Sequence, residues 1–151
     1  NIALGKPEAS QEEIERVARI ACVHDDIVRF PRGYQTEVGE KGVTLSGGQK
    51  QRLAIARALL LDAPILVLDD ALSAVDAHTE QQILLALKVH KRTLVLVSHR
   101  MTAVEQADEI LVLEQGAISE RGRHETLMAR NGWYADMVRY QRLEQDVEES
   151  L

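Results

Sequence analysis

Hydrophobic residues in the first part of the chain recur at helical spacing. Ser10-Gln11-Glu12-Glu13 has the pattern of a capping box, and the apolar positions after it predict an amphipathic helix that reaches about Val23. A second helix is predicted after Gly47-Gly48 and runs to about Leu61. Phe30 to Gly33 and Gly39 to Gly42 interrupt the pattern between the two helices and predict loops.

After Pro64 the pattern changes to short apolar runs that alternate with helical segments. Ile65 to Leu68, directly after the proline, is wholly apolar and predicts a strand covered on both faces. Further strands are predicted at 93–97, 110–113 and, after a turn at Gly116, 117–120, and helices at 79–87, 101–107, 124–129 and 133–143. Alternating strands and helices predict an α/β domain with a largely parallel sheet.

These patterns suggest three regions. Residues 1–62 form a helical subdomain, residues 63–143 form the strand-containing part with its helices, and residues 144–151 form a frayed acidic tail. We found neither an internal repeat nor a low-complexity segment.

Composition narrows the possible functions. A formal net charge of −6 over 151 residues argues against a general nucleic-acid surface, which requires a basic field. Cys22 is the single cysteine, so no internal disulfide forms, and its position predicts a small core residue on a helix. No apolar run is long enough to cross a bilayer, and the first residues lack the basic region and cleavage site of a signal peptide.

The segment Leu45-Ser46-Gly47-Gly48-Gln49 stands at the start of the second predicted helix. Small residues allow another molecule to approach the backbone there, and exposed amides at the positive end of a helix can bind an anion. The alternative is an ordinary glycine-flanked helix cap.

Two aspartates follow the first predicted strand. A carboxylate at the end of a strand can hold Mg²⁺, and a second can orient an attacking water, which gives Asp69 and Asp70 candidate roles. The alternative is that both cap a turn. Ser73 to Asp76 comes next, and His99 follows the second strand, where ligands bind in α/β sheets.

The order of these segments resembles the ABC ATPase family over nearly the whole chain. Leu45 to Gln49 resembles the signature motif, Ile65 to Asp70 the Walker B strand, Ser73 to Asp76 the D-loop and His99 the switch histidine. Thr36 to Glu40 resembles the X-loop of exporters, which touches transmembrane coupling helices. Asp69-Asp70 and Gly132-Trp133-Tyr134 extend the likeness to bacterial multidrug-resistance-like (Mdl-type) half transporters.

The resemblance implies a partial P-loop NTPase (RecA-like) parallel sheet with an α-helical subdomain. ATP and Mg²⁺ are the implied ligands: Asp69 would hold the metal, Asp70 the water, His99 the γ-phosphate, and Asp76 would lie at the interface with a partner. The signature residues Leu45 to Gln49 would close over ATP held by a second ABC ATPase subunit. Such a protein powers export of a multidrug or lipid-like substrate from the cytoplasmic face of the bacterial inner membrane.

Two features depart from the family pattern. No Gly-x-x-x-x-Gly-Lys-Ser/Thr phosphate loop occurs in the chain, so we expect the Walker A strand and loop to lie upstream and the chain alone to be inactive. Asp70 occupies the position that usually carries glutamate, and its shorter reach predicts a slow site. An intact signature with a shortened carboxylate favours an asymmetric heterodimer.

Two other interpretations remain open from the sequence. One is a DNA-repair or chromosome-maintenance ATPase, although the short spacing between motifs leaves no room for the coiled coil of those proteins. The other is a non-enzymatic fragment that only binds partners.

Overall fold

The computed structural model describes residues 1–39, 42–89 and 92–148. The chain forms two compact units, Asn1–Val97 and Ser98–Leu151, each described below by itself. The predicted boundary after residue 62 falls inside the first unit and stays a prediction. Within the described ranges, no helix is both long and apolar enough to span a membrane.

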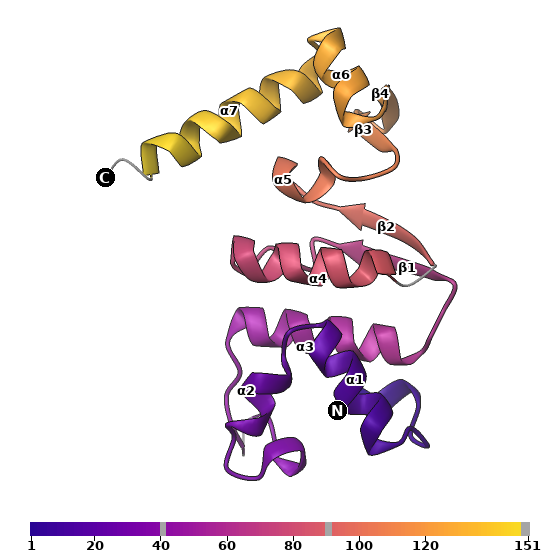
Figure 1. Cartoon of the computed structure of the whole chain (residues 1–151), viewed down its shortest axis with the longest axis vertical. Helices are drawn as coiled ribbons and strands as arrows, with labels where there is room; N and C mark the ends of the chain where they lie inside the picture. The colour runs from indigo at the N-terminus through magenta and orange to yellow at the C-terminus, as the bar shows by residue number, and fades with distance from the viewer. Residues whose placement is uncertain (40–41, 90–91, 149–151) are drawn as a thin grey trace. The chain divides into compact units, whose positions relative to one another are not determined.

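The first unit combines helices with a small parallel sheet (Figure 1), which confirms the predicted α/β class. Its elements are the 3₁₀-helices η1 (Ile2–Gly5) and η2 (Gly33–Gln35), the helices α1 (Gln11–Ile20), α2 (His24–Val28), α3 (Gly47–Leu60) and α4 (Ala77–Val89), and the strands β1 (Ile65–Asp69) and β2 (Thr93–Val97).

Helix α1 begins as predicted and ends three residues early. The amide of Glu13 donates to Ser10 Oγ (3.2 Å), and the Ser10 amide donates to Glu13 Oε2 (2.8 Å), which completes the capping box. The helix ends at Ile20 because Cys22 takes a left-handed backbone conformation (φ 53°) that a helix cannot contain. Cys22 is therefore a half-buried turn residue, not a core residue on a helix.

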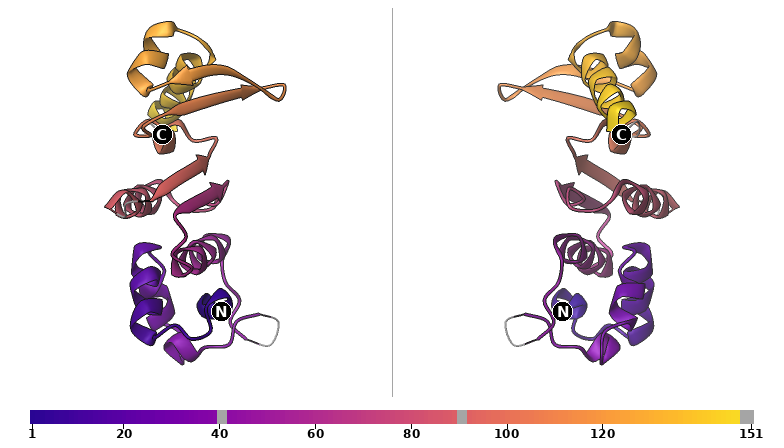
Figure 2. Two further views of the ribbon diagram at one scale, coloured as in Figure 1. Left: turned by 90° about the vertical axis from the view of Figure 1, so that its right-hand side faces the viewer. Right: turned by 90° about the vertical axis from the view of Figure 1, so that its left-hand side faces the viewer.

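Strands β1 and β2 are parallel neighbours, and their register places Ile65 opposite Thr93 and Asp69 opposite Val97. Leu66 and Leu68 belong to the core that α3 and α4 share with the sheet. Successive side chains of a strand point to opposite faces, so the other residues of β1 face away from this core. Figure 2 shows the two strands as neighbouring arrows that point the same way.

The opposite face of the sheet is apolar and uncovered within this unit. Ile65 is 58% exposed, Val67 60%, Val95 44% and Val97 48%. The prediction that the strands are covered on both faces is therefore wrong for this unit. A run of consecutive apolar residues is typical of a strand that is packed on both faces, whereas in this unit helices pack on only one face of the sheet.

The second unit contains a short helix α5 (Met101–Val104), an antiparallel hairpin of β3 (Ile110–Glu114) and β4 (Ala117–Gly122), and the helices α6 (His124–Arg130) and α7 (Trp133–Glu148). The predicted third strand thus pairs with β4 and does not extend the parallel sheet. Helix α7 continues through residues 144–148, where we expected a frayed tail, because no proline or glycine stops it there. Residues 149–151 of that tail lie outside the described part.

Candidate functional site

Ser46 and Gln49 form a reciprocal cap at the start of α3. The amide of Gln49 donates to Ser46 Oγ (3.2 Å), and the Ser46 amide donates to Gln49 Oε1 (3.0 Å). The amides of Gly47 and Gly48 occupy the first turn, where helix geometry provides no intrahelical partner. Ser46 and Gln49 thus form a helix cap, which was the alternative interpretation of this segment. The amides of Gly47 and Gly48 remain directed out of the helix end.

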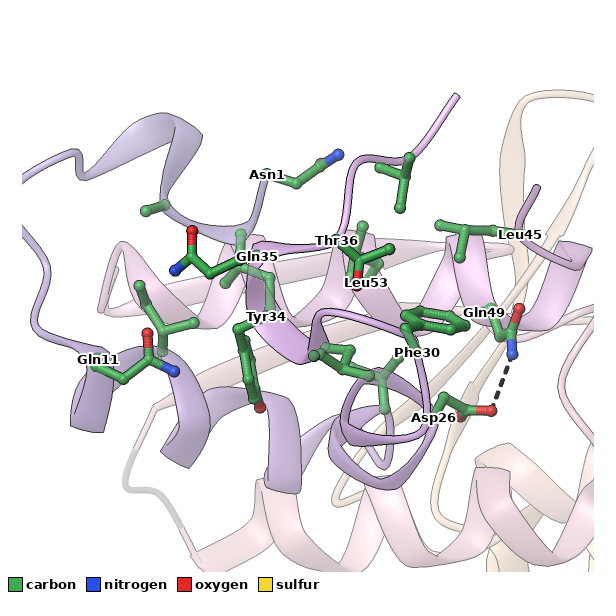
Figure 3. A pocket seen from close by; sticks show the side chains of 17 residues that line it. Asn1, Gln11, Asp26, Phe30, Tyr34, Gln35, Thr36, Leu45, Gln49 and Leu53 are labelled. Carbon is green, nitrogen blue, oxygen red and sulfur yellow. Dashed lines mark hydrogen bonds between the residues drawn. The ribbon is translucent and has the colours of Figure 1, made fainter. Parts of the chain in front are cut away.

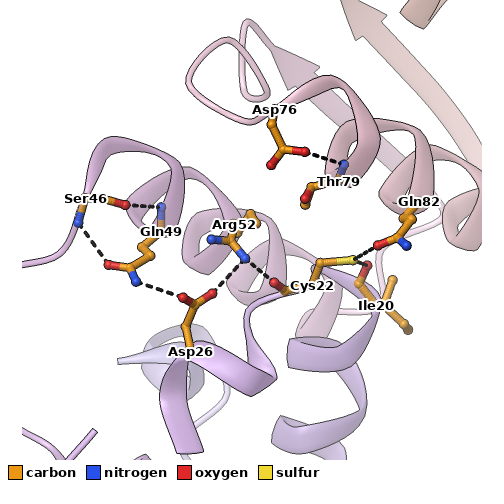
Figure 4. A network of polar contacts seen from close by, with 9 residues as sticks. All are labelled: Ile20, Cys22, Asp26, Ser46, Gln49, Arg52, Asp76, Thr79 and Gln82. Carbon is orange, nitrogen blue, oxygen red and sulfur yellow. Dashed lines mark hydrogen bonds and ion pairs between the residues drawn. The ribbon is translucent and has the colours of Figure 1, made fainter. Parts of the chain in front are cut away.

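The side chain of Gln49 is held at both ends of its amide. In addition to the bond from Ser46, Gln49 Nε2 donates to Asp26 Oδ1 (2.9 Å). The other carboxylate oxygen of Asp26 pairs with Arg52 Nη1 (2.8 Å), and Arg52 also donates to the carbonyl of Cys22. Figure 4 shows this network, which ties α3 to α2 and to the turn after α1. Gln49 therefore contributes to the rigidity of the segment.

The two glycines of the segment lie against a loop of the same chain. A Cβ built on Gly48 would come within 2.7 Å of the carbonyl oxygen of Ala74, and one on Gly47 would lie 3.4 Å from the Ala74 side chain. Gly48 is therefore required by an internal contact, whereas Gly47 has ordinary van der Waals space on that side.

Both candidate aspartates lie exposed at the C-terminal end of β1. Asp69 is the last residue of the strand, and Asp70 turns the chain with φ 47°. The Asp70 amide still donates to the carbonyl of Val97 (3.1 Å), so the backbone of Asp70 is fixed to β2. Aspartate tolerates this left-handed conformation better than longer residues do.

Gln51 of α3 binds the loop that follows these aspartates. Its Nε2 donates to Ser73 Oγ (2.9 Å) and to the carbonyl of Asp70 (3.3 Å), and its Oε1 accepts from the amide of Ala74 (2.8 Å). The start of α3 and the end of β1 are thereby joined through one side chain.

Asp76 ends the same loop by capping α4. Its Oδ1 accepts a hydrogen bond from the amide of Thr79 (2.9 Å). That bond, with a second from the Thr79 side chain, lowers the pKa of Asp76 below its usual value. Asp76 is exposed and stays a negatively charged group at neutral pH.

His99 belongs to the second unit, where its side chain is exposed. Its carbonyl accepts a hydrogen bond from Gln141 Nε2 (2.6 Å), and Gln141 Oε1 accepts from the amide of Met101 (2.9 Å). Helix α7 therefore holds the backbone on both sides of Arg100.

The described residues contain no group of three or more His, Cys, Asp or Glu side chains that could hold a metal ion. The described side chains therefore do not enclose a cation by themselves. An exposed carboxylate such as Asp69 fits Mg²⁺ in another way, because Mg²⁺ keeps several waters and binds one or two carboxylates together with substrate phosphates.

A pocket of about 250 Å³ opens beside the start of α3 (Figure 3). Its lining includes Phe30, Tyr34, Leu53 and the side chain of Leu45. Thr36 and Val38, from the segment resembling the X-loop, line it as well. Glu40 of that segment lies outside the described residues.

The first unit brings together most of the predicted site: the start of α3, Asp69, Asp70 and the 73–76 loop. Two features that organise this site were not predicted from the sequence. The Ser46–Gln49 cap has the same S-x-x-E/Q pattern that identified Ser10–Glu13, and was available from the sequence. Gln51 gave no local signal, because its partners lie 19 to 23 residues away.

Comparison with known proteins identifies relatives. Residues 7–73 match the family model described as ABC transporter. The chain is 60% identical over 146 residues to the multidrug resistance-like ATP-binding protein MdlA of Escherichia coli. The matched region covers 95% of this chain and 25% of that protein. It is 51% identical over 143 residues to the ATP-dependent lipid A-core flippase of Chromohalobacter salexigens. That match covers 93% of this chain and 25% of the flippase.

A human protein and a solved structure extend the comparison. The ATP-binding cassette sub-family B member 6 of Homo sapiens is 47% identical over 151 residues, covering 99% of this chain and 18% of that protein. A bacterial Atm1-family ABC exporter with ATP bound superimposes with a TM-score of 0.85 at 46% identity, covering 93% of this chain and 25% of that one. The chain thus spans about a quarter of the bacterial relatives.

Proposed function

Because this chain carries part of the ATP-binding domain of an ABC transporter, we propose that it is the ATPase portion of an exporter subunit. In this proposal ATP binding closes two such domains and hydrolysis reopens them. The motion reaches a transmembrane domain of the same polypeptide through the segment at 36–40, at the cytoplasmic face of a bacterial inner membrane. A multidrug or lipid-like molecule is the proposed cargo, by analogy with the names of the relatives.

One observation carries the proposal: the start of α3 and the carboxyl end of β1 are built as a single polar assembly. Gly48 lies against Ala74, and Gln51 joins α3 to the loop after Asp70. Amides for an anion and carboxylates for a metal and a water are thus held in fixed relation.

We assign roles to individual residues as follows. Ser46, Gly47 and Gly48 act as the signature motif and contact ATP held by the partner, with Leu45 and Gln49 as its flanking residues. Asp69 acts at the end of the Walker B strand and holds Mg²⁺ together with phosphate oxygens. Asp70 orients the attacking water, Asp76 lies at the subunit interface, and His99 contacts the γ-phosphate.

The two nucleotide sites differ in this proposal. The Asp70 carboxylate is one methylene shorter than glutamate, so this chain's own site hydrolyses slowly. Its signature segment serves the partner's site fully. We therefore propose a heterodimer with a second ABC ATPase subunit. None of the relatives named above is a DNA-repair or chromosome-maintenance protein, so that alternative gains no support.

The test uses the full-length protein with its partner subunit in lipid. Asp69→Asn should abolish Mg²⁺-dependent hydrolysis at this chain's own site, because an amide cannot replace the anionic metal ligand. Ser46→Arg should reduce hydrolysis at the partner's site instead. Glu8→Gln, the removal of an exposed charge far from these residues in sequence, is the control.

Single-turnover hydrolysis with each site blocked in turn separates the two effects. The proposal fails if the full-length pair has no Mg²⁺-ATP hydrolysis, or if Asp69→Asn leaves hydrolysis at both sites unchanged. The isolated chain should neither hydrolyse ATP nor bind it tightly, and hydrolysis by the chain alone would contradict the need for an upstream phosphate loop.

A further inference from the structure

Gln51 is a half-buried residue that uses both ends of its side-chain amide on one loop. The donor end reaches Ser73 Oγ and the Asp70 carbonyl, and the acceptor end receives the Ala74 amide. Ser73 Oγ itself donates to the Asp70 carbonyl (3.0 Å), so that one carbonyl oxygen accepts from both side chains.

This arrangement adds to the bonds that fix the backbone of Asp70. Asp70 is in a left-handed conformation, which residues other than glycine adopt uncommonly. Its amide is fixed to Val97, and its carbonyl accepts from the Ser73 amide (3.4 Å) and hydroxyl within the loop and from Gln51 of α3. The placement of the Asp70 side chain therefore depends in part on the bonds that Gln51 makes.

We infer that Gln51 is a positioning residue that sets the placement of Asp70 and couples it to the signature segment. The inference rests on the proposed function, in which Asp70 serves this chain's ATP and Ser46 to Gly48 serve the partner's. Gln51 lies three residues after Gly48 on the same helix, so a displacement of the α3 start by the partner's nucleotide moves the Asp70 loop directly. One side chain thus transmits the state of one nucleotide site to the other.

The test compares two variants of the full-length pair. Gln51→Ala removes the side chain, and Gln51→Met keeps its length and shape while removing all three hydrogen bonds. Both should lower kcat at this chain's own site about 10- to 100-fold while KM for ATP changes less than about threefold, because binding is retained and geometry is lost. Gln81→Ala, the same change at an exposed glutamine of α4, is the control and should leave both constants unchanged.

A normal kcat in Gln51→Met would overturn the inference, since packing alone would then suffice. So would a rise in KM as large as the fall in kcat, which would indicate general damage to the site. Amide exchange in the folded wild-type pair provides a measurement that needs no variant: the Ala74 amide should exchange at least about tenfold more slowly than exposed loop amides. An Ala74 amide that exchanges as fast as exposed loop amides would also overturn the inference. If Asp69→Asn abolishes hydrolysis while both Gln51 variants act normally, the proposed function stands and only this inference falls.

Discussion

The carbonyl oxygen of Ala74 occupies the space that a side chain on Gly48 would need. A Cβ at Gly48 would lie 2.7 Å from this oxygen, whereas one at Gly47 would meet only the Ala74 methyl group at 3.4 Å. The internal packing of the chain therefore requires glycine at position 48 but not at position 47, although both residues lie at the start of α3.

Gly48→Ala should destabilise the protein by about 1–3 kcal/mol, because the backbone of the 73–76 loop must move away from α3. Gly47→Ala should cost less than about 1 kcal/mol, since the contact is of ordinary length. Thermal unfolding of the full-length pair measures both. Equal melting temperatures for the two variants would contradict the assignment.

Asp70→Glu should raise hydrolysis at this chain's own site, by up to about 10²-fold, because the added methylene restores the reach of the carboxylate. The left-handed backbone of residue 70 opposes the change with a small loss of stability. Single-turnover assays with the partner's site blocked measure the rate. If Asp70→Glu leaves the rate unchanged and Asp70→Asn abolishes it, aspartate is already a competent catalyst and the asymmetric heterodimer loses its main support.

The uncovered face of the sheet predicts that the chain, produced alone, associates with itself. Val67 and Val95 expose apolar surface beside strand edges that can pair with another chain. Val67→Thr and Val95→Thr together should shift the chain toward monomer in sedimentation at micromolar concentration. Val89→Thr, which changes a valine that is 80% exposed on α4, should not. A monodisperse wild-type monomer would contradict this prediction.

Gln141→Ala should lower kcat about tenfold in the full-length pair, because Gln141 holds the backbone at His99 and Met101. Nucleotide affinity should stay within about threefold. Leu143→Ala removes an exposed side chain (65%) from the same helix and serves as the control. Identical kinetics in the two variants would show that α7 has no influence on His99.

The Glu13 carboxylate makes α1 sensitive to acid. A hydrogen bond from Lys6 (2.6 Å), together with the bonds from Ser10, lowers the pKa of Glu13 from 4.5 to about 2. Its stabilising contribution is complete above pH 4.5 and is lost as the pH falls through about 2. Glu13→Gln should flatten the pH dependence of hydrogen-exchange protection in α1 over this range. Glu12→Gln, at an exposed position of the same turn, should leave the dependence intact.

Local sequence patterns predicted most of the elements, and long-range contacts account for what they missed. The Ser10 capping box and the apolar run before Asp69 are encoded within a few residues, and both elements form where expected. The turn at Cys22 carries no glycine or proline, so nothing in the pattern marked the early end of α1. The run of apolar residues in β1 indicates that both faces of the strand are packed, but it does not identify the segments that pack on each face.

The candidate site shows the same division. Asp69, Asp70 and the start of α3 were found because carboxylates after a strand and glycines before a helix are local signals. Gln51 was missed because its function depends on a loop brought close by the fold. No spacing rule links a residue in the first helical turns of α3 to an amide 23 residues later.

Bonds hold the loop from Asp70 to Asp76 at its start, middle and end: the Asp70 amide to Val97, Ser73 and the Ala74 amide to Gln51, and the Asp76 carboxylate to Thr79. An extra residue inserted between two of these bonds would move one bonding group away from its partner. The number of residues in the loop is therefore as constrained as their identity. Among evolutionary descendants of the same ancestor, insertions and deletions should therefore be eliminated here.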